Sequence, residues 1–281
     1  MVLYISCGEE SGTGKVYQVD ESGRVLGIVN LPYTATGIAL HRDNGLVLAV
    51  PRDGGKIMRI DDTAKVSILV DKDKEVVHPV DVALPAESDS VLIADNIAGL
   101  LAATTSVGGT PKIYHRFPPD KWNAPEMSIA VTKDRHVIYG TTNPVGVYRF
   151  SGDDYSMKQA PLLPNEGGVA ADTTSLKWAA TQQPNLVYVF EGEELVKKLR
   201  LPPNKSIYRQ GLLSFGLSGH VVVATRPSDD PSGQVWLLEY GTEKDETRSL
   251  FAWDKERMVD FVVGPRMFWD RNDREQYKNT Y

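Results

Sequence analysis

Residues 37–50 read GIALHRDNGLVLAV, and the same plan returns four more times along the chain. The plan is a short apolar strand with a small residue inside it, a polar turn, and a second strand rich in β-branched residues. The later copies begin DVALPAESDS (81–90), SIAVTKDRH (128–136), GVAADTTSL (168–176) and LLSFGLSGH (212–220). Their second strands are VLIAD (91–95), VIYGT (137–141), KWAAT (177–181) and VVVAT (221–225). Self-similarity of this kind indicates one structural unit that is repeated around a fold.

Two further strands follow in each copy, so the unit is a four-stranded blade. The third strands read KIMRID, GLLAAT, GVYRFS, LVYVFE and QVWLLEY, and charged fourth strands such as LVKKLRL (195–201) close the unit. The period is roughly 41 to 45 residues, which is typical of a propeller blade. No window sustains a helical period of 3.6 residues over the length of a helix. The sequence therefore predicts an all-β fold, a β-propeller of four antiparallel strands per blade.

The two ends of the chain together supply a sixth blade. VLYISC, KVYQVD (15–20) and RVLGIVNL (24–31) match the second, third and fourth strands, without a first strand before them. RMVDFVVG (257–264) reads as a first strand without clear partners after it. We therefore expect six blades in a ring closed by pairing this C-terminal strand with the N-terminal strands. Two separate domains are the competing interpretation, which the unbroken repeat disfavours.

The expected blades divide one domain, residues 1–281, without a linker. Their approximate bounds are 2–32 with 257–264, then 36–71, 79–117, 125–163, 166–202 and 209–252. Residues 265–281 would form a tail over the closure, and whether RMFWDR adds a further strand is left open.

Composition narrows the classes of partner and compartment. The formal net charge of −6 is spread along the chain, so no basic face points to nucleic acid. No apolar run approaches the ~18 residues of a membrane span. Cys7 is the only cysteine, so we expect a buried structural thiol and no internal disulfide. The N-terminus lacks the features of a signal peptide, which favours a cytoplasmic location. A secreted protein whose signal was removed is the alternative. We also expect the protein to be a monomer.

The segment GEESGTGK (8–15) looks like a phosphate-binding loop but has the wrong spacing. Five residues separate Gly8 from the Gly-Lys pair where a Walker A loop has four, and Val16 follows Lys15 in place of Ser or Thr. The next segment alternates as a strand and offers no helix N-terminus to a phosphate. We therefore expect a hairpin loop here.

Polar loop residues recur where first strands begin and second strands end, and these positions share one face of a propeller. Sites for small molecules favour such mouths, where many loops converge. The predicted ligand-binding residues are Arg52, Asn96, Asn143, Gln182, Arg209, Gln210 and Arg226. Guanidinium groups suit a carboxylate or phosphate, because their forked donors match two oxygens. The predicted catalytic residues are Glu126, Glu166 and His78, where His78 would be a base oriented by the nearby Asp81.

Residues 79–117 resemble a blade of the senescence-marker-protein/gluconolactonase superfamily, which includes strictosidine synthase-like proteins. The phrase LIADNIAGLL (92–101) is similar to the one that marks the second and third strands in that superfamily, and NHL-repeat proteins share part of it. The resemblance implies a six-bladed ring with a divalent metal, usually calcium, in its channel. It also implies hydrolysis of lactones or phosphoesters, with other reactions catalysed by metal-free relatives.

The metal positions that the resemblance implies are largely without suitable ligands in this chain. They fall on Thr36, Val80, Met127, Gly167 and Gly211, and none of these side chains has a carboxylate or amide oxygen. A shift of one residue brings in Glu126, Glu166 and Gln210, a partial set. We therefore predict no metal ligands and no cofactor, with Ca²⁺ at the shifted positions as the alternative.

Two functions remain open on the sequence alone. The first is a small-molecule-binding propeller with its ligand at the channel mouth, as a lactonase-like hydrolase or a metal-free lyase or cyclase that shapes its ligand. The second is a non-enzymatic scaffold that presents loops to another protein, as NHL-repeat modules do.

Overall fold

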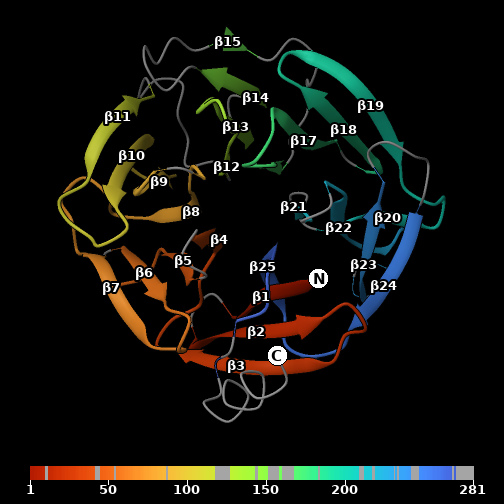
Figure 1. The fold of residues 1–281 in the computed structure, drawn as a ribbon, viewed down its shortest axis with the longest axis horizontal. Helices are drawn as coiled ribbons and strands as arrows, with labels where there is room; N and C mark the ends of the chain where they lie inside the picture. Colours follow the sequence, from red (N-terminus) through yellow and green to blue (C-terminus); the bar gives the residue numbers. More distant parts are fainter. Residues whose placement is uncertain are drawn as a thin grey trace, which may run out of the picture.

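The computed structural model describes residues 1–9, 12–41, 45–53, 55–86, 88–117, 127–142, 145–150, 158–159, 168–182, 184–208, 212–216, 219–230, 232, 234–241, 247–267 and 269. All regular structure in these ranges is β-strand, in six separate antiparallel sheets (Figure 1). The predicted all-β class is thus confirmed.

The first three sheets hold strands from the N-terminal half and one from the C-terminal end. The first has the order β25 (Met258–Gly264), β1 (Val2–Gly8), β2 (Gly14–Asp20) and β3 (Val25–Leu31). The second has the order β4 (Gly37–His41), β5 (Gly45–Val50), β6 (Lys56–Ile60) and β7 (Val66–Asp71). The third runs β8 (Pro79–Ala83), β9 (Ser90–Asp95), β10 (Leu100–Thr105) and β11 (Lys112–Arg116).

The remaining three sheets follow in chain order. One has the order β12 (Met127–Val131), β13 (Val137–Thr142), β14 (Val145–Phe150) and β15 (Lys158–Gln159). The next has β16 (Val169–Ala171), β17 (Lys177–Gln182), β18 (Leu186–Glu191) and β19 (Glu194–Arg200). The last has β20 (Lys205–Ile207), β22 (Val221–Pro227), β23 (Val235–Tyr240) and β24 (Thr247–Trp253), with the short β21 (Leu213–Phe215) also paired to β22.

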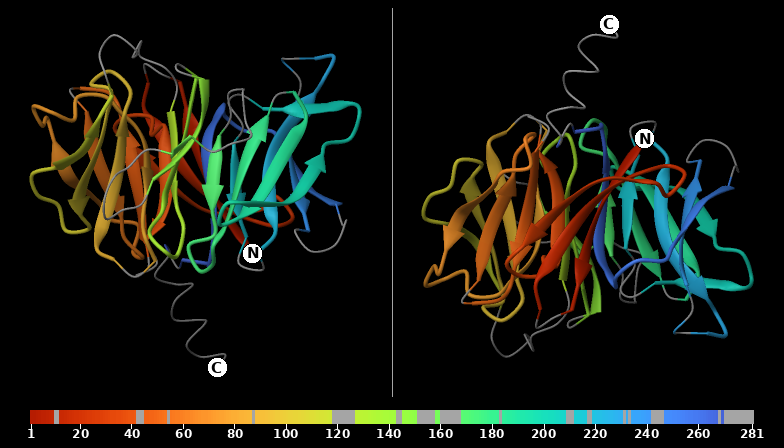
Figure 2. Two further views of the ribbon diagram at one scale, coloured as in Figure 1. Left: turned by 90° about the horizontal axis from the view of Figure 1, so that it is seen from above. Right: turned by 90° about the horizontal axis from the view of Figure 1, so that it is seen from below.

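The sheets stand around one axis (Figure 1). Strands β4, β8, β12, β21 and β25 lie near the centre in Figure 1, and β3, β7, β11, β19 and β24 form the rim. Seen from the side, the sheets lie next to one another with their strands running roughly along the axis of the ring (Figure 2). This radial arrangement is that of a β-propeller.

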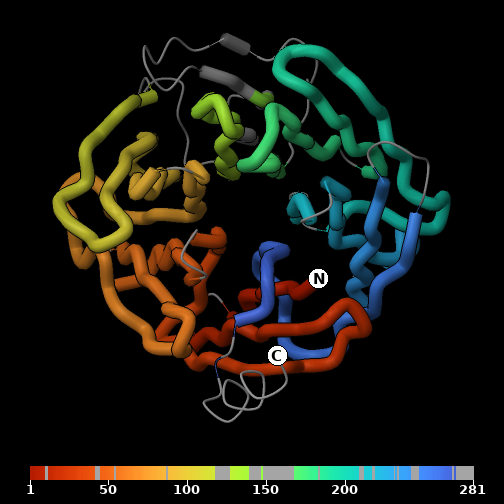
Figure 3. Tube along the Cα trace, in the orientation of Figure 1, coloured from red at the N-terminus to blue at the C-terminus, as the bar shows by residue number. Residues whose placement is uncertain are grey.

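One sheet joins segments from opposite ends of the sequence. Strand β1 pairs with β2 on one side and with β25 on the other, in register from Val2↔Gly264 to Cys7↔Met258 with an irregularity after Ser6. The red and blue tubes of Figure 3 accordingly run side by side in this blade. Both long edges of β1 are thereby hydrogen-bonded and shielded from other chains.

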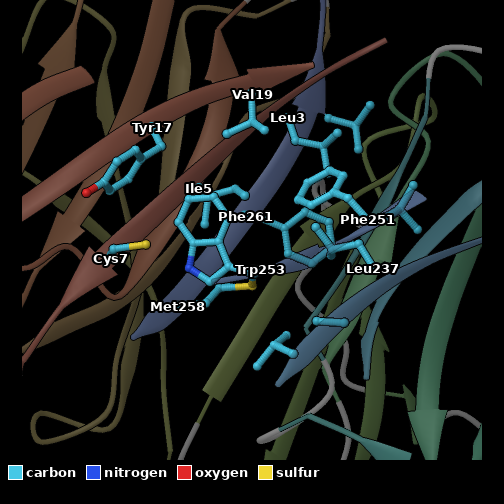
Figure 4. Close-up of a cluster of buried hydrophobic side chains, with 14 residues drawn as sticks. Leu3, Ile5, Cys7, Tyr17, Val19, Leu237, Phe251, Trp253, Met258 and Phe261 are labelled. Carbon is cyan, nitrogen blue, oxygen red and sulfur yellow. The ribbon is translucent and has the colours of Figure 1, made fainter. Parts of the chain in front are cut away.

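A large apolar cluster packs this blade against the sheet of β22, β23 and β24 (Figure 4). Trp253 meets Tyr17 edge to face with ring centroids 5.2 Å apart, and Phe261 and Leu237 fill the space beside them. Cys7 is fully buried in the same cluster, as predicted, and is not disulfide-bonded. Each fully buried large apolar side chain contributes about 1.5–3 kcal/mol to folding, so the cluster holds the two blades together.

Hydrogen bonds from side chains join the innermost strands of neighbouring blades. The acceptor is a side-chain oxygen on one inner strand, and the donor is a backbone N–H on the next. The four pairs are Asp260 Oδ2 with Ile38 N (2.9 Å), Asp81 Oδ2 with Ile129 N (2.8 Å), Ser128 Oγ with Val169 N (3.2 Å), and Ser214 Oγ with Val263 N (3.1 Å). Backbone donors that face the channel are thus satisfied across the blades.

Three local features bear on the sequence predictions. Gly8 and Gly14 pair across the β1–β2 hairpin, which confirms a hairpin in place of a phosphate-binding loop. The described tail residues, 265–267 and 269, form no strand. They are held by the Tyr4 hydroxyl, which donates to the Pro265 carbonyl (2.6 Å) and accepts from Met267 N (2.9 Å) and Gln18 Nε2 (3.0 Å). No helix in the described residues is long and apolar enough to span a membrane.

Candidate functional site

A cavity of about 830 Å³ follows the axis of the propeller. Its walls are the inner strands β4, β8, β12, β16, β21 and β25, together with the loops at their ends. The small residues that the repeat places inside each first strand, Ala39, Ala83, Ala130, Ala170 and Ser214, all line it. Small side chains at these positions leave the axis open where six strands converge.

His78 and Asn96 meet at the wall of this cavity. His78 precedes β8 and Asn96 follows β9, so the antiparallel pairing of these strands brings the two residues together. The distance from His78 Nδ1 to Asn96 Oδ1 is 2.7 Å. With this amide orientation the neutral imidazole carries its proton on Nδ1, which leaves Nε2 as an acceptor. Asn96 therefore orients the imidazole in this structure, whereas the Asp81 carboxyl accepts hydrogen bonds from Val82 N and Ile129 N.

Asp95 fixes the backbone around this pair. It is fully buried, and its Oδ2 accepts a hydrogen bond from His78 N (2.6 Å). Its Oδ1 accepts from Ile97 N (3.1 Å) and Ala98 N (2.8 Å), as in an Asx-turn. The aspartate of the phrase LIADNIAGLL thus shapes the loop that carries Asn96, a structural role that the sequence analysis did not assign.

The loop that carries Arg52 packs against the segment that carries His78. Gly55 has a φ of +77°, and a Cβ there would lie 2.8 Å from both Pro79 Cδ and the Val77 carbonyl, so the loop packs closely on the segment around His78. Lys56 anchors the loop through Asp53 Oδ2 (3.0 Å). Lys56 Nζ also contacts Asp71 Oδ1 at 2.8 Å. The exposed Arg52 side chain and the His78–Asn96 pair therefore belong to one mouth of the cavity.

Arg257 is a second guanidinium at the cavity wall that the sequence analysis missed. It stands three residues before Asp260, just as His78 stands three residues before Asp81. Its Nη1 lies 3.1 Å from Glu9 Oε2, and its carbonyl accepts from Gly8 N (3.1 Å). Alignment of the C-terminal first strand with the other copies would have identified this position.

Two aspartates, Asp81 and Asp260, occupy equivalent positions on the inner strands and line the cavity. Each carboxyl accepts one hydrogen bond from its own strand and one from the next blade: Asp81 from Val82 N and Ile129 N, and Asp260 from Phe261 N and Ile38 N. Burial raises the pKa of Asp81 to about 7, against the smaller lowering effects of these backbone donors and of the Ser128 hydroxyl.

The other titratable groups that line the cavity in the described ranges are His41, Arg52, His78, Asp172, Arg257 and Asp260. Arg52, His78 and Arg257 lie at the mouth where first strands begin. Asp81 and Asp260 lie further along the wall, on the inner strands themselves. The cavity thus combines a cationic mouth with carboxyl groups deeper in the channel.

The structure brings together part of the predicted site. Arg52, His78 and Asn96 line the cavity, whereas Gln182 and Arg226 do not. Gln182 Oε1 accepts a hydrogen bond from Tyr188 on the neighbouring strand, and Arg226 pairs in register with Ser206. The other predicted residues, Glu126, Asn143, Glu166, Arg209 and Gln210, lie outside the described residues.

The calcium positions implied by the resemblance do not suit a metal where they are described. Thr36, Val80 and Met127 line the cavity, and only Thr36 has a side-chain oxygen. Its hydroxyl faces the Ala49 carbonyl at 3.5 Å. Calcium requires six to eight oxygen ligands, several of them charged. In the described part of the chain, no group of three or more His, Cys, Asp or Glu residues is arranged to hold a metal ion.

Comparison with known proteins supports the architecture. No protein-family model matches the chain, and no curated protein matches it. Among solved structures, a chain from the crystal structure of a nidogen–laminin complex aligns with a TM-score of 0.68 and 8% identity, over 93% of this chain and 97% of that one. The β-propeller domain of Cps50 (Swd1) from Myceliophteria thermophila aligns with a TM-score of 0.63 and 14% identity, over 92% and 85%. These likenesses confirm the β-propeller fold; the gluconolactonase-like superfamily remains a prediction.

Proposed function

We propose that this propeller binds a small molecule in its axial cavity, with the polar mouth around His78 and Arg52 as the recognition site. The observation that carries the proposal is the His78–Asn96 hydrogen bond at the wall of an 830 Å³ cavity. Ligand pockets commonly have volumes of roughly 300–1,000 Å³ and a few convergent polar groups in a mostly apolar wall. The proposal takes the six sheets as six blades, with β25 closing the ring on β1.

The chemistry of the mouth suggests the kind of ligand. Arg52 offers forked donors that match the two oxygens of a carboxylate or phosphate. His78 offers Nε2 as a proton acceptor, in an orientation set by Asn96. In the enzymatic form of the proposal, His78 takes a proton from a water molecule whose oxygen attacks a lactone or ester carbonyl. The acyl C–O bond then breaks, and the protonated imidazole returns the proton to the departing alkoxide, which gives a hydroxyl group and a carboxylic acid. The resemblance to gluconolactonase-like blades supports this reaction class.

The test is a binding assay with matched arginine variants. Glucono-δ-lactone, gluconate and phosphoserine are titrated into wild-type protein and into Arg52→Gln, His78→Ala and Arg226→Gln by calorimetry, and lactone opening is followed by proton release. We expect at least one compound to bind, with an affinity lowered by about tenfold in Arg52→Gln and unchanged in Arg226→Gln, whose arginine is outside the cavity. Equal affinities for the two arginine variants, or no binding at all, would contradict the proposal.

A protein-binding scaffold is the second candidate. It is favoured by one similar structure, which is that of a protein complex, nidogen with laminin. Under this alternative, loop variants at the mouth would leave small-molecule titrations flat, and the partner would be a protein.

A further inference from the structure

Asp81 is a half-buried residue whose carboxyl group lines the cavity, and its charge is not balanced by a described cation. Its partners are the backbone N–H groups of Val82 and Ile129 and the hydroxyl of Ser128, and no described lysine, arginine or histidine forms an ion pair with it. Hydrogen bonds alone compensate only part of the cost of burying a carboxylate, and for this reason burial raises its pKa. A ligand that brings a positive charge to Asp81 would supply the missing compensation.

Gly37, on the inner strand of the preceding sheet, packs directly against Asp81. A Cβ on Gly37 would lie 2.5 Å from Asp81 Cα and 2.6 Å from its Oδ1, so this inner strand has no side chain where it passes the carboxyl. The next residue, Ile38, donates its N–H to Asp260. Both carboxyl groups therefore border the same dipeptide, and both contribute negative potential to this section of the cavity wall.

The opposite charge is found at the mouth. Arg52 and Arg257 line the cavity at the end where first strands begin, and Arg52 has no described ion-pair partner. A ligand that spans from the mouth to Asp81 therefore meets a guanidinium at one end and a carboxyl at the other. A cavity with a guanidinium at its mouth and a carboxyl further in selects ligands by the sign of the charge at each of their ends.

We propose that the ligand of the axial cavity is a small zwitterion, an amine that also carries a carboxylate or phosphate, with its ammonium group on Asp81 and its anionic group on Arg52. This inference rests on the proposed function and specifies the class of ligand. The ammonium group donates charge-assisted hydrogen bonds to the free lone pairs of the Asp81 carboxylate. The aliphatic part of the ligand lies along the apolar wall of inner-strand side chains.

The experiment compares ligands that differ only at one end. ω-Amino acids from γ-aminobutyrate to ε-aminocaproate are titrated at pH 8 by calorimetry, each beside the fatty acid and the ω-hydroxy acid of the same length. For at least one length we expect the amino acid to bind about tenfold or more tightly than both analogues to the wild-type protein. This comparison needs no variant and stands even if a substitution in the channel prevents folding.

Variants then assign the two ends. Asp81→Asn should remove the preference for the amino acid and leave the affinity for the fatty acid unchanged, whereas Asp172→Asn, a cavity-wall aspartate engaged in an Asx-turn with Thr174, should change neither. If fatty acids bind as well as amino acids in an Arg52-dependent manner, the zwitterion is refuted and the proposed function stands. If the preference persists in Asp81→Asn, the placement of the ammonium group is wrong. If none of these compounds binds, the inference is refuted, and the lactone and phosphate titrations decide the proposed function separately.

Discussion

Replacing Asp81 with asparagine should remove a pH dependence from the stability of the propeller. The pKa of Asp81 is raised from 3.8 to about 7 by burial. Because the folded state then binds the proton more tightly than the unfolded state, the stabilisation is fully present below pH 3.8 and is lost as the pH rises through 7. At 1.36 kcal/mol for each tenfold change in proton affinity, the difference between 3.8 and about 7 corresponds to at most about 4 kcal/mol.

The assay is urea unfolding at several pH values between 4 and 8, followed by tryptophan fluorescence. Between these limits, the free energy of unfolding of the wild type should fall by up to about 4 kcal/mol relative to Asp81→Asn. Only the difference in slope matters, because asparagine also replaces one acceptor with a donor and shifts the whole curve. Asp20→Asn is the matched control: hydrogen bonds within its turn hold the pKa of Asp20 below its ordinary value, so its removal adds no slope above pH 5. Parallel curves for the wild type and Asp81→Asn would refute the reasoning.

Three further substitutions or treatments test the packing. Gly37→Ala should lower the stability of the protein by several kcal/mol, because its Cβ would overlap the Asp81 backbone. Gly12→Ala is the control and should change the thermal midpoint little, because a Cβ there would have no neighbour closer than 3.8 Å. Equal midpoints for the two variants would contradict this. Tyr4→Phe removes three hydrogen bonds of the Tyr4 hydroxyl and should lower the free energy of unfolding in urea by about 1–3 kcal/mol. The C-terminal segment should also be proteolysed faster. An unchanged midpoint and digestion pattern would show that this hydroxyl does not hold the segment in place. Cys7 should resist a disulfide reagent at pH 8 until the protein unfolds, since burial raises the pKa of its thiol; stoichiometric reaction in native buffer would exclude this.

The strands were largely predictable because their pattern repeats. Residues 37–41 and 45–50 are strands, as GIALHRDNGLVLAV indicates, and the same holds for the second strand in each later copy. The exception is the copy that begins at 212, where β22 pairs both with the short inner strand β21 and with β20, which precedes it in the chain. Apolar alternation gives the positions of strands, but it does not show how one long strand is shared by two short partners.

The candidate site was only partly predictable, because its key contacts depend on register between strands. Arg52, His78 and Asn96 were identified from their places at strand ends, which is a local property. The partner of His78 was not identified from the sequence. Asp81 is close to His78 in the sequence, but the pairing of β8 with β9 places Asn96 beside the imidazole. The proximity of Asp81 to Gly37, in the preceding blade, is a contact between repeats that no single repeat encodes.

The pairing of β1 with β25 has a consequence for how the protein is made. Strand β1 leaves the ribosome before β25, and the two paired strands are separated by about 250 residues of chain. Until β25 arrives, β1 presents an open edge of backbone donors and acceptors to any other extended chain. The last intramolecular pairing also carries the largest loop-closure cost, which slows it relative to the local hairpins. Nascent chains should therefore depend most on chaperones after five sheets are complete and before the ring has closed.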